Sequence, residues 1–167
     1  FQRHVLKRSQ EELLDEMLGA VRAAREAGAE VNLFMPESTR ASLEHIRMAV
    51  EGAEKEGASA VTVVDSQGVA RPAAITYLVR QIKSWTRLGV EVHCHNDFGL
   101  AVVNVLAAYE GGADALHCAV NAVGYRAGNA ALEEVAMALE VLYGVKTGLR
   151  LDQLPELSRL VEEITGL

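Results

Sequence analysis

The chain has 167 residues, of which 50% are hydrophobic and 23% are charged, and its formal net charge is −7. This length suits one hydrophobic core, so we expect a single domain over residues 1–167. The acidic composition disfavours nucleic acids and anionic membranes as partners, and the lack of a long apolar run or a signal-peptide-like start predicts a cytoplasmic protein.

Helical and strand-like segments alternate along the chain. Ser9 is a favourable N-cap for the first helix, and Glu11 and Glu12 follow it in the first turn. Each turn from a helix into the next strand carries a glycine, in the sequences A-G-A, E-G-A, L-G-V and G-G-A. The predicted helices cover residues 9–27, 39–57, 71–88, 98–111, 129–143 and 152–165, and the predicted strands cover 30–35, 59–65, 89–95 and 113–121.

The repeated strand–helix order predicts an α/β fold with a parallel sheet. It is typical either of a doubly wound sheet or of part of a (β/α)8 barrel. Both folds build their sites at the carboxyl ends of the strands. In this chain those ends are all polar and read P-E-S-T (36–39), D-S-Q-G (65–68), H-C-H-N-D (93–97) and N-A-V-G-Y-R-A-G-N (121–129).

Two histidines close the third predicted strand. His93 and His95 are two residues apart, so their side chains point to the same face of that strand. A single histidine in such a place most often makes a hydrogen bond in the core, but a pair at a strand end favours metal binding. Two imidazoles do not complete a metal site, so further ligands are needed.

The other polar residues at the strand ends have two interpretations each. Asn129 is either an N-cap for the helix that follows or a third metal ligand, and its position alone favours the cap. Arg126 either binds an anionic group or is a solvated loop charge. Four further residues are either functional or ordinary turn and cap residues, namely Glu37, Ser66, Asn96 and Asp97.

Two segments together resemble the DRE-TIM metallolyases. They are H-C-H-N-D-F-G-L-A-V-V-N (93–104) and G-Y-R-A-G-N-A-A-L-E-E-V (124–135). The family includes isopropylmalate, homocitrate and citramalate synthases, hydroxymethylglutaryl-CoA lyase and hydroxyoxovalerate aldolases, and the chain is most similar to the synthases. The resemblance covers essentially the whole chain and implies a TIM barrel, of which this chain supplies roughly strands five to eight.

The resemblance implies roles for the candidate residues. His93, His95 and Asn129 match positions that hold a divalent metal ion (Mg, Mn or Zn), which favours a ligand over a cap at Asn129. Glu37 matches an acidic residue close to the substrate in some synthases. Ser66 stands where many synthases have a threonine whose hydroxyl can bind the carboxylate of a 2-oxo acid.

The remaining roles also follow from the resemblance. Either Arg126 or an arginine of the family's first strand is implied to help stabilise a negatively charged oxygen, and Glu37 and Arg126 are the catalytic candidates in this chain. Asn96 and Asp97 lie inside the H-C-H-N-D motif and join Ser66 as substrate-binding candidates.

The implied activity is a metal-dependent condensation of acetyl-CoA with a 2-oxo acid. The alternatives are a lyase or aldolase of the same family, or a catalytically inactive barrel fragment. Departures from the family pattern at Ala119, Ala122 and Tyr125 support the last alternative. Because four parallel strands cannot close a barrel, we expect either an amino-terminal barrel half or a second copy as partner, and a homodimer.

Overall fold

The computed structural model describes residues 8–166, so the ends of the predicted domain, residues 1–7 and 167, lie outside the described part. The strands are β1 (Asn32–Met35), β2 (Ala60–Asp65), β3 (Gly89–Cys94) and β4 (Ala115–Leu116). The α-helices are α1 (Gln10–Glu26), α2 (Leu43–Lys55), α3 (Pro72–Trp85), α4 (Ala101–Gly111), α5 (Leu132–Val141) and α6 (Leu154–Thr165). The short 3-10 turns are η2 (Ser38–Arg40), η3 (Val120–Ala122) and η4 (Leu151–Gln153).

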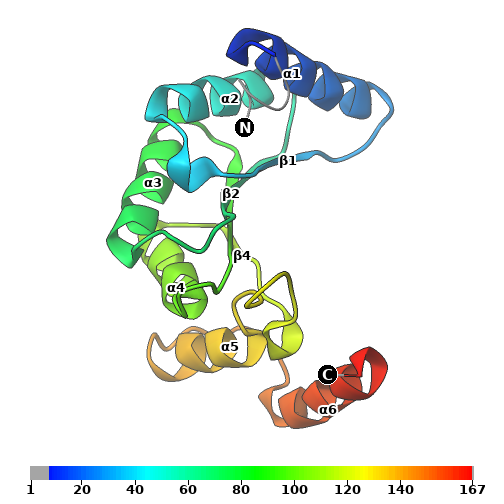
Figure 1. Cartoon of the computed structure of the whole chain (residues 1–167), viewed down its shortest axis with the longest axis vertical. Helices are drawn as coiled ribbons and strands as arrows, with labels where there is room; N and C mark the ends of the chain where they lie inside the picture. Colours follow the sequence, from blue (N-terminus) through cyan, green and yellow to red (C-terminus); the bar gives the residue numbers. More distant parts are fainter. Residues whose placement is uncertain (1–7, 167) are drawn as a thin grey trace.

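The strands form one parallel sheet in the order β1-β2-β3-β4, which is also their order along the chain. This topology confirms the predicted α/β class with a parallel sheet. In Figure 1 the chain forms an arc, with the strands on its inner side and α2, α3 and α4 on its outer side. The inner side is therefore a concave face, and the connecting helices α2, α3 and α4 do not cover it.

Local sequence signals explain where the helices begin. Ser9 and Glu12 form a capping box at α1, in which the Glu12 N–H donates to the Ser9 hydroxyl at 3.1 Å and the Ser9 N–H donates to the Glu12 carboxylate at 2.8 Å. Ser42 caps α2 with a single such hydrogen bond, in which its side chain accepts from the His45 N–H. Pro72 opens α3, where its missing N–H leaves no hydrogen bond unmade.

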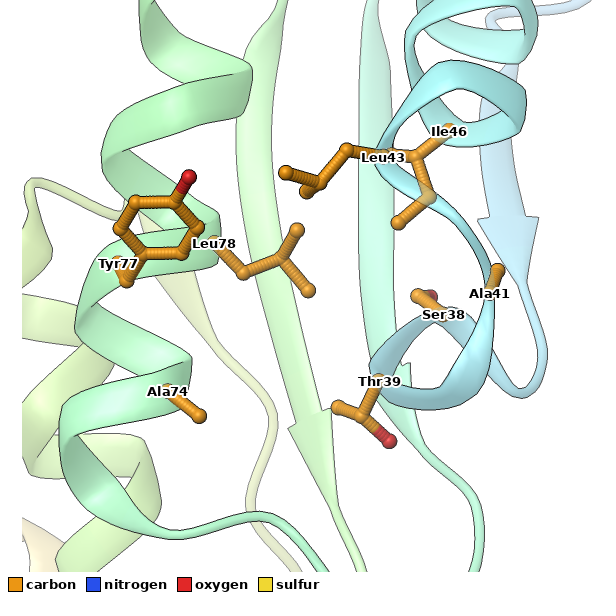
Figure 2. A pocket seen from close by; sticks show the side chains of 8 residues that line it. All are labelled: Ser38, Thr39, Ala41, Leu43, Ile46, Ala74, Tyr77 and Leu78. Carbon is orange, nitrogen blue, oxygen red and sulfur yellow. The ribbon is translucent and has the colours of Figure 1, made fainter.

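The core lies between β2, β3 and the outer helices. All six residues of β2 are buried. Val61 and Val63 belong to the same buried cluster as Val50 of α2 and Ile75 and Val79 of α3. Each such side chain contributes about 1.5–3 kcal/mol when it is fully buried, so this layer is the main source of stability. A small cavity of about 150 Å³ remains in the outer layer between η2, α2 and α3, as Figure 2 shows.

Strand β1 shows how the two faces of the sheet differ. Leu33 and Met35 are buried under the helices, whereas Asn32 and Phe34 are exposed on the concave face. The backbone register places Phe34 beside Thr62 of β2. The alternation follows from the period of two along a strand, and it brings one row of side chains from each strand onto the open face.

Several predicted boundaries differ from the structure, including the start of the predicted helix 98–111, which begins at Ala101, and the end of the predicted helix 71–88, which lies at Trp85. The predicted strand 113–121 is reduced to Ala115–Leu116, because the Ala119 N–H bonds to the Ala130 carbonyl and the backbone turns at Asn121 and Ala122, which both have positive φ. The predicted helix 39–57 begins only at Leu43, after the separate turn η2.

The predicted helix 129–143 begins only at Leu132, and its N-cap is Ala131. The interpretation of Asn129 as the cap of this helix is therefore wrong. The backbone of Asn129 instead pairs with the end of β3, where an isolated bridge joins it to His95.

Within residues 8–166, none of the helices combines the length and the apolar character that crossing a membrane requires.

Candidate metal and substrate site at the carboxyl end of the sheet

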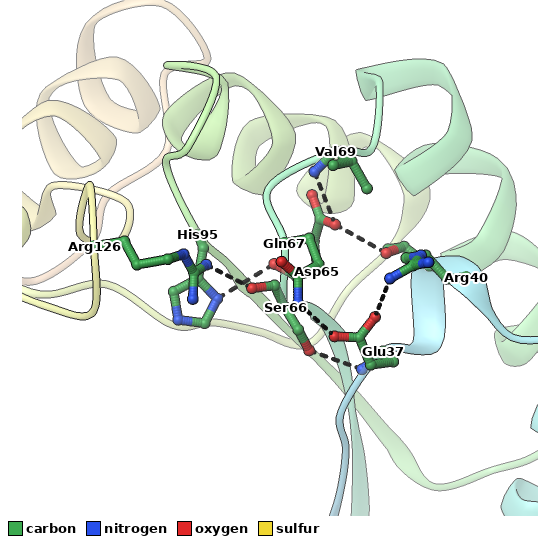
Figure 3. Close-up of polar contacts among 9 residues, drawn as sticks. Glu37, Arg40, Asp65, Ser66, Gln67, Val69, His95 and Arg126 are labelled. Carbon is green, nitrogen blue, oxygen red and sulfur yellow. Dashed lines mark hydrogen bonds and ion pairs between the residues drawn. The ribbon is translucent and has the colours of Figure 1, made fainter. Parts of the chain in front are cut away.

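The polar segments at the strand ends meet along one edge of the sheet. Glu37 follows β1, Ser66 follows β2, Asp97 follows β3 and Arg126 follows β4. Hydrogen bonds join these four residues into one rim. Figure 3 shows Glu37, Ser66 and Arg126 of this rim. The structure thus brings together, on one edge, residues that span ninety positions of the chain, as the parallel topology predicts.

His93 and His95 lie side by side on the concave face. Their ring centroids are 4.9 Å apart, and the ring planes are nearly perpendicular. The His95 ring nitrogen Nδ1 lies 3.3 Å from the Asp65 carbonyl oxygen. A carbonyl oxygen can only accept, so Nδ1 is the donor and Nε2 is the ring nitrogen left to face a ligand. This is the arrangement in which a histidine binds a metal through Nε2.

The His93 ring is held in its neutral form. Burial lowers its pKa to about 4, with a smaller contribution from the neighbouring rings of His95 and His117. A neutral imidazole has a free lone pair and is the form that binds metals.

Asn129 completes a pocket with the two histidines. Its Nδ2 donates to the Val123 carbonyl at 2.9 Å. Its Oδ1 is buried and has no hydrogen-bond partner. Both histidines and Asn129 line an open pocket of about 420 Å³, together with the loop residues Val123, Gly124 and Tyr125.

Gly124 is required for this position of Asn129. A Cβ atom at residue 124 would lie 2.2 Å from the Asn129 Nδ2 atom, far inside contact distance. In the sequence this glycine is visible only as part of a motif, because a close approach between residues five positions apart in a loop has no pattern of its own.

The chemistry of the pocket residues fits a divalent cation in part. A buried, unpartnered oxygen costs about 1–3 kcal/mol unless something satisfies it, and a cation would do so. Together with the two imidazoles, Asn129 Oδ1 gives a mixed nitrogen and oxygen set that such a cation accepts. Across residues 8–166 no group of three or more His, Cys, Asp and Glu side chains is placed to hold a metal. The set therefore fits a cation as a partial site that needs a further ligand.

Arg126 is committed to the rim. Its guanidinium donates to both carboxylate oxygens of Asp97, at 2.6 and 2.8 Å, and to the Ser66 carbonyl at 2.7 Å. The hydrogen bond from Arg126 holds the pKa of Asp97 below its usual range, and the same bond raises the pKa of Arg126. Arg126 also has a positive φ of 57°, an unfavourable conformation that the surrounding contacts maintain.

Glu37 and Ser66 form the other half of the rim. The Glu37 backbone N–H donates to the Ser66 hydroxyl oxygen at 2.8 Å, which leaves the hydroxyl proton of Ser66 free to be donated. The Glu37 carboxylate accepts from Gln67 at 3.0 Å and from Arg40 at 3.2 Å. Glu37 also has a positive φ of 61°.

Asn96 serves a structural role with part of its side chain. Its Oδ1 accepts from the Ala101 N–H at 3.1 Å, at the first turn of α4, as a cap residue would. Its backbone N–H donates to the Gly128 carbonyl at 2.9 Å, which ties the end of β3 to the loop before Asn129.

Asp65 organises the site, although it was not a candidate. The side chain is fully buried, and its carboxylate accepts hydrogen bonds from Thr39 at 2.8 Å, the Val69 N–H at 3.2 Å and the Ala70 N–H at 3.0 Å. Its backbone carbonyl orients His95. The available signal was a carboxylate at the end of an apolar strand, which needs partners to be buried.

Comparisons with known proteins agree with the motif resemblance. A family model described as HMGL-like matches residues 1–161. The chain is 42% identical over 165 residues to the 2-isopropylmalate synthase of Methanocaldococcus jannaschii, which is 99% of this chain and 32% of the relative. It is 44% identical over 165 residues to the homocitrate synthase AksA of Methanopyrus kandleri, which is 99% of this chain and 42% of the relative.

A solved structure shows the same fold. An HMG-CoA lyase from Acinetobacter baumannii, in complex with coenzyme A and 3-methylmalate, matches with a TM-score of 0.79 and 25% identity over 96% of this chain and 56% of that chain. The chain spans 32% and 42% of the two curated relatives named above, so it corresponds to part of a longer catalytic protein in each case. Because the family model covers nearly the whole chain, the resemblance to the DRE-TIM metallolyases is confirmed, and the chain belongs to the HMGL-like family.

Proposed function

We propose that the full-length protein containing this chain condenses acetyl-CoA with a 2-oxo acid, as an acyltransferase of the 2-isopropylmalate and homocitrate synthase type. The observation that carries this proposal is the pocket that His93, His95 and Asn129 line together, with the side-chain oxygen of Asn129 buried and unpartnered. The identity of about 40% to two synthases supports it. A divalent cation (Mg, Mn or Zn) bound by these three residues would supply Lewis-acid polarisation of the 2-oxo carbonyl.

The rim would bind and orient the substrates. Ser66 has a free hydroxyl proton on the rim and would donate it to the carboxylate of the 2-oxo acid. The Nδ2 group of Asn96 would add a second donor. Asp97 would act by holding Arg126 in place through their ion pair. The hydrogen bonds of Arg126 fix the loop, and its positive charge, at the edge of the site, would stabilise negative charge that develops on the substrate.

Glu37 is the candidate base in this chain. Its carboxylate accepts hydrogen bonds from Arg40 and Gln67 at the end of β1, where Glu37 is part of the rim. In the proposed reaction a base removes a proton from the methyl group of acetyl-CoA, and the resulting carbon forms a bond to the 2-oxo carbon. The carbonyl oxygen then takes up a proton, and water cleaves the thioester to release free coenzyme A and a carboxylate.

The open sheet indicates what completes the site. Strands β1 and β4 each have one neighbour in the described sheet, so each leaves a row of backbone groups for further pairing. We propose that these strands are roughly strands five to eight of a closed barrel, that the amino-terminal half or a second copy supplies the remaining strands and a metal ligand, and that the complete protein is a homodimer.

A lyase of the same family is the second candidate function. The HMG-CoA lyase with bound coenzyme A has the same fold as this chain at 25% identity. A lyase would break the carbon–carbon bond that a synthase forms, with the same metal and the same pocket. The two candidates can be distinguished by substrate: a synthase converts acetyl-CoA and a 2-oxo acid, whereas a lyase cleaves a 3-hydroxyacyl-CoA.

The test measures metal content and thiol release in the full-length protein. We expect stoichiometric divalent metal and release of free thiol from acetyl-CoA only when a 2-oxo acid is present, and His93→Ala should remove both. His45→Ala is the matched control, because His45 lies in the outer helix α2. Cleavage of a 3-hydroxyacyl-CoA without condensation would favour the lyase. A protein without stoichiometric metal would support the inactive-fragment alternative and contradict the proposal.

A further inference from the structure

We propose that Asn121 and Ser158 position the proposed metal ligand Asn129, by joining helix α6 to the backbone turn that holds Asn129 in the pocket. We call this pair of residues the α6 latch. The inference rests on the proposed function, because it takes Asn129 as a metal ligand. It gives roles to two residues that neither the motifs nor the rim identified, and it makes α6 a support of the site.

The two side chains of the α6 latch bond to each other in both directions. The Asn121 Nδ2 group donates to the Ser158 carbonyl at 2.9 Å, and the Ser158 hydroxyl donates to the Asn121 Oδ1 atom at 2.6 Å. Both polar atoms of the amide are therefore bonded to one residue, which lies 37 positions later in the chain, in α6. Figure 1 shows α6 at the lower end of the arc, near the end of the chain. Both hydrogen bonds are partly buried, so water competes with them less than at the surface.

The α6 latch holds a turn that the backbone does not favour by itself. Asn121 and Ala122 have consecutive positive φ values of 54° and 55°. Asparagine tolerates this conformation, whereas alanine adopts it only at a cost, so contacts from outside the turn must maintain it. One such contact comes from α5, where both carboxylate oxygens of Glu133 accept from the Asn121 N–H, at 3.0 and 3.2 Å. The latch supplies the other contact, through the side chain.

The turn is bonded directly to Asn129. The Ala122 carbonyl accepts from the Asn129 N–H at 3.0 Å. The same carbonyl lies so close to Gly128 that a Cβ atom at residue 128 would overlap it. The Val123 carbonyl, one residue further on, accepts from the Asn129 Nδ2 group at 2.9 Å. A shift of the turn would therefore move both the backbone and the side chain of Asn129.

The test uses variants that separate the latch from the turn. Asn121→Gly removes the side chain but keeps the backbone N–H that bonds to Glu133, and glycine adopts a positive φ without strain. Ser158→Ala removes one hydrogen bond of the latch at a helix position, where alanine is favourable, and carries the test if the Asn121→Gly protein does not fold. Thr165→Ala is the matched control, because it also removes a hydroxyl from α6, one that bonds to the Val161 carbonyl within the helix.

The first measurement is the Kd of the full-length protein for Zn²⁺, by competition with a chelator. We expect Asn121→Gly to raise the Kd about tenfold, as for other residues that orient a metal ligand. Ser158→Ala should raise it about threefold to tenfold, which corresponds to one ordinary hydrogen bond. Thr165→Ala should leave it unchanged. In an Asn129→Ala background, Asn121→Gly should have no further effect, because the latch acts through Asn129.

The second measurement needs no metal. Hydrogen exchange of the Asn129 amide reports on its bond to the Ala122 carbonyl. In the metal-free, full-length protein this exchange should accelerate about tenfold in Asn121→Gly and less in Ser158→Ala, because the turn opens more often without the latch. It should not change in Thr165→Ala.

The outcomes separate the inference from the proposed function. If the unmodified protein binds no Zn²⁺ but exchange of the Asn129 amide accelerates as expected, the latch positions Asn129 and the metal-dependent condensation fails. If Zn²⁺ binds and thiol is released, but neither the Kd nor the exchange changes in the two latch variants, the inference is overturned and the condensation stands. An equal loss of affinity from Asn121→Gly in the Asn129→Ala background would also overturn it, because the latch would then not act through Asn129.

Discussion

His95 donates its Nδ1–H to the carbonyl oxygen of Asp65, across 3.3 Å. The acceptor is backbone and belongs to a residue whose own carboxylate is buried and fully engaged. The orientation of a proposed metal ligand therefore depends on the last residue of the neighbouring strand β2.

Replacing Asp65 should destabilise the protein and loosen His95. Asp65→Asn removes at least one acceptor position for Thr39, Val69 or Ala70, and hydrogen bonds to a charged group are worth about 1.5–3 kcal/mol each. We expect the free energy of unfolding, measured in urea, to fall by about 1.5–3 kcal/mol. Asp152→Asn, at an exposed carboxylate, is the control and should change it by less than about 0.5 kcal/mol. Equal values for the two variants would contradict the role given to Asp65.

Removing the side-chain oxygen of Asn129 should weaken metal binding. Asn129→Ala removes a buried oxygen that lacks a protein partner, and we expect the metal Kd, measured by competition with a chelator, to rise at least about tenfold. Asn129→Asp keeps an oxygen and adds a negative charge, so it should retain binding. Gln153→Ala removes an exposed amide next to α6 and is the control. An unchanged affinity in Asn129→Ala would show that this oxygen is not a ligand.

A methyl group at residue 124 should displace Asn129. In Gly124→Ala the new Cβ would lie 2.2 Å from the Asn129 Nδ2 atom, so the amide must move and metal affinity should fall as in Asn129→Ala. Gly19→Ala is a matched control, because nothing lies within 4 Å of its Cβ and the position is inside α1. There alanine should stabilise the protein by about 0.5–1 kcal/mol. A Gly124→Ala protein with unchanged metal affinity would contradict the close packing.

The ion pair of Arg126 and Asp97 should set the pH at which the loop 124–128 loosens. The pKa of Asp97 is lowered in the folded protein, so the pair stabilises the loop above the ordinary pKa of an aspartate and is lost as pH falls through the lowered value. Relative to the intrinsic rate of an unprotected amide at the same pH, hydrogen exchange of the loop should therefore stay slow through mildly acidic pH and then accelerate.

Two variants test this assignment. Asp97→Asn should remove the pH-dependent acceleration, because the titrating group is gone. Arg126→Lys should exchange faster at neutral pH, because a lysine cannot reproduce the forked contact with both carboxylate oxygens. The same pH profile in Asp97→Asn and in the unmodified protein would rule out Asp97 as the controlling group.

The two thiols should react slowly in the folded protein. Burial raises the pKa of Cys94 far above its usual range and raises the pKa of Cys118 to about 11, so little thiolate exists near neutral pH. We expect iodoacetamide to leave Cys94 unmodified and to label Cys118 slowly, whereas both should label readily in urea. Rapid labelling of Cys94 without denaturant would show that β3 opens more easily than its burial implies.

The sequence alone determined the α/β class, the parallel sheet and the edge at which the polar residues gather. Hydrophobic period, glycines and caps are local signals, and a strand ending in H-x-H fixes both histidines on one face because the period of a strand is two. The family resemblance then indicated Asn129, Ser66 and Glu37, which local reasoning left undecided between functional and cap roles.

Only the tertiary structure decided how these residues contact one another. Asn32 meets Glu91 across 59 positions of sequence, and Arg126 meets the Ser66 carbonyl across 60. Such contacts depend on strand register and on loop backbones with positive φ, and neither leaves a periodic signal in the sequence. For the same reason the short strand β4 and the true start of α5 could not be predicted. Long-range hydrogen bonds, rather than local preference, set those boundaries.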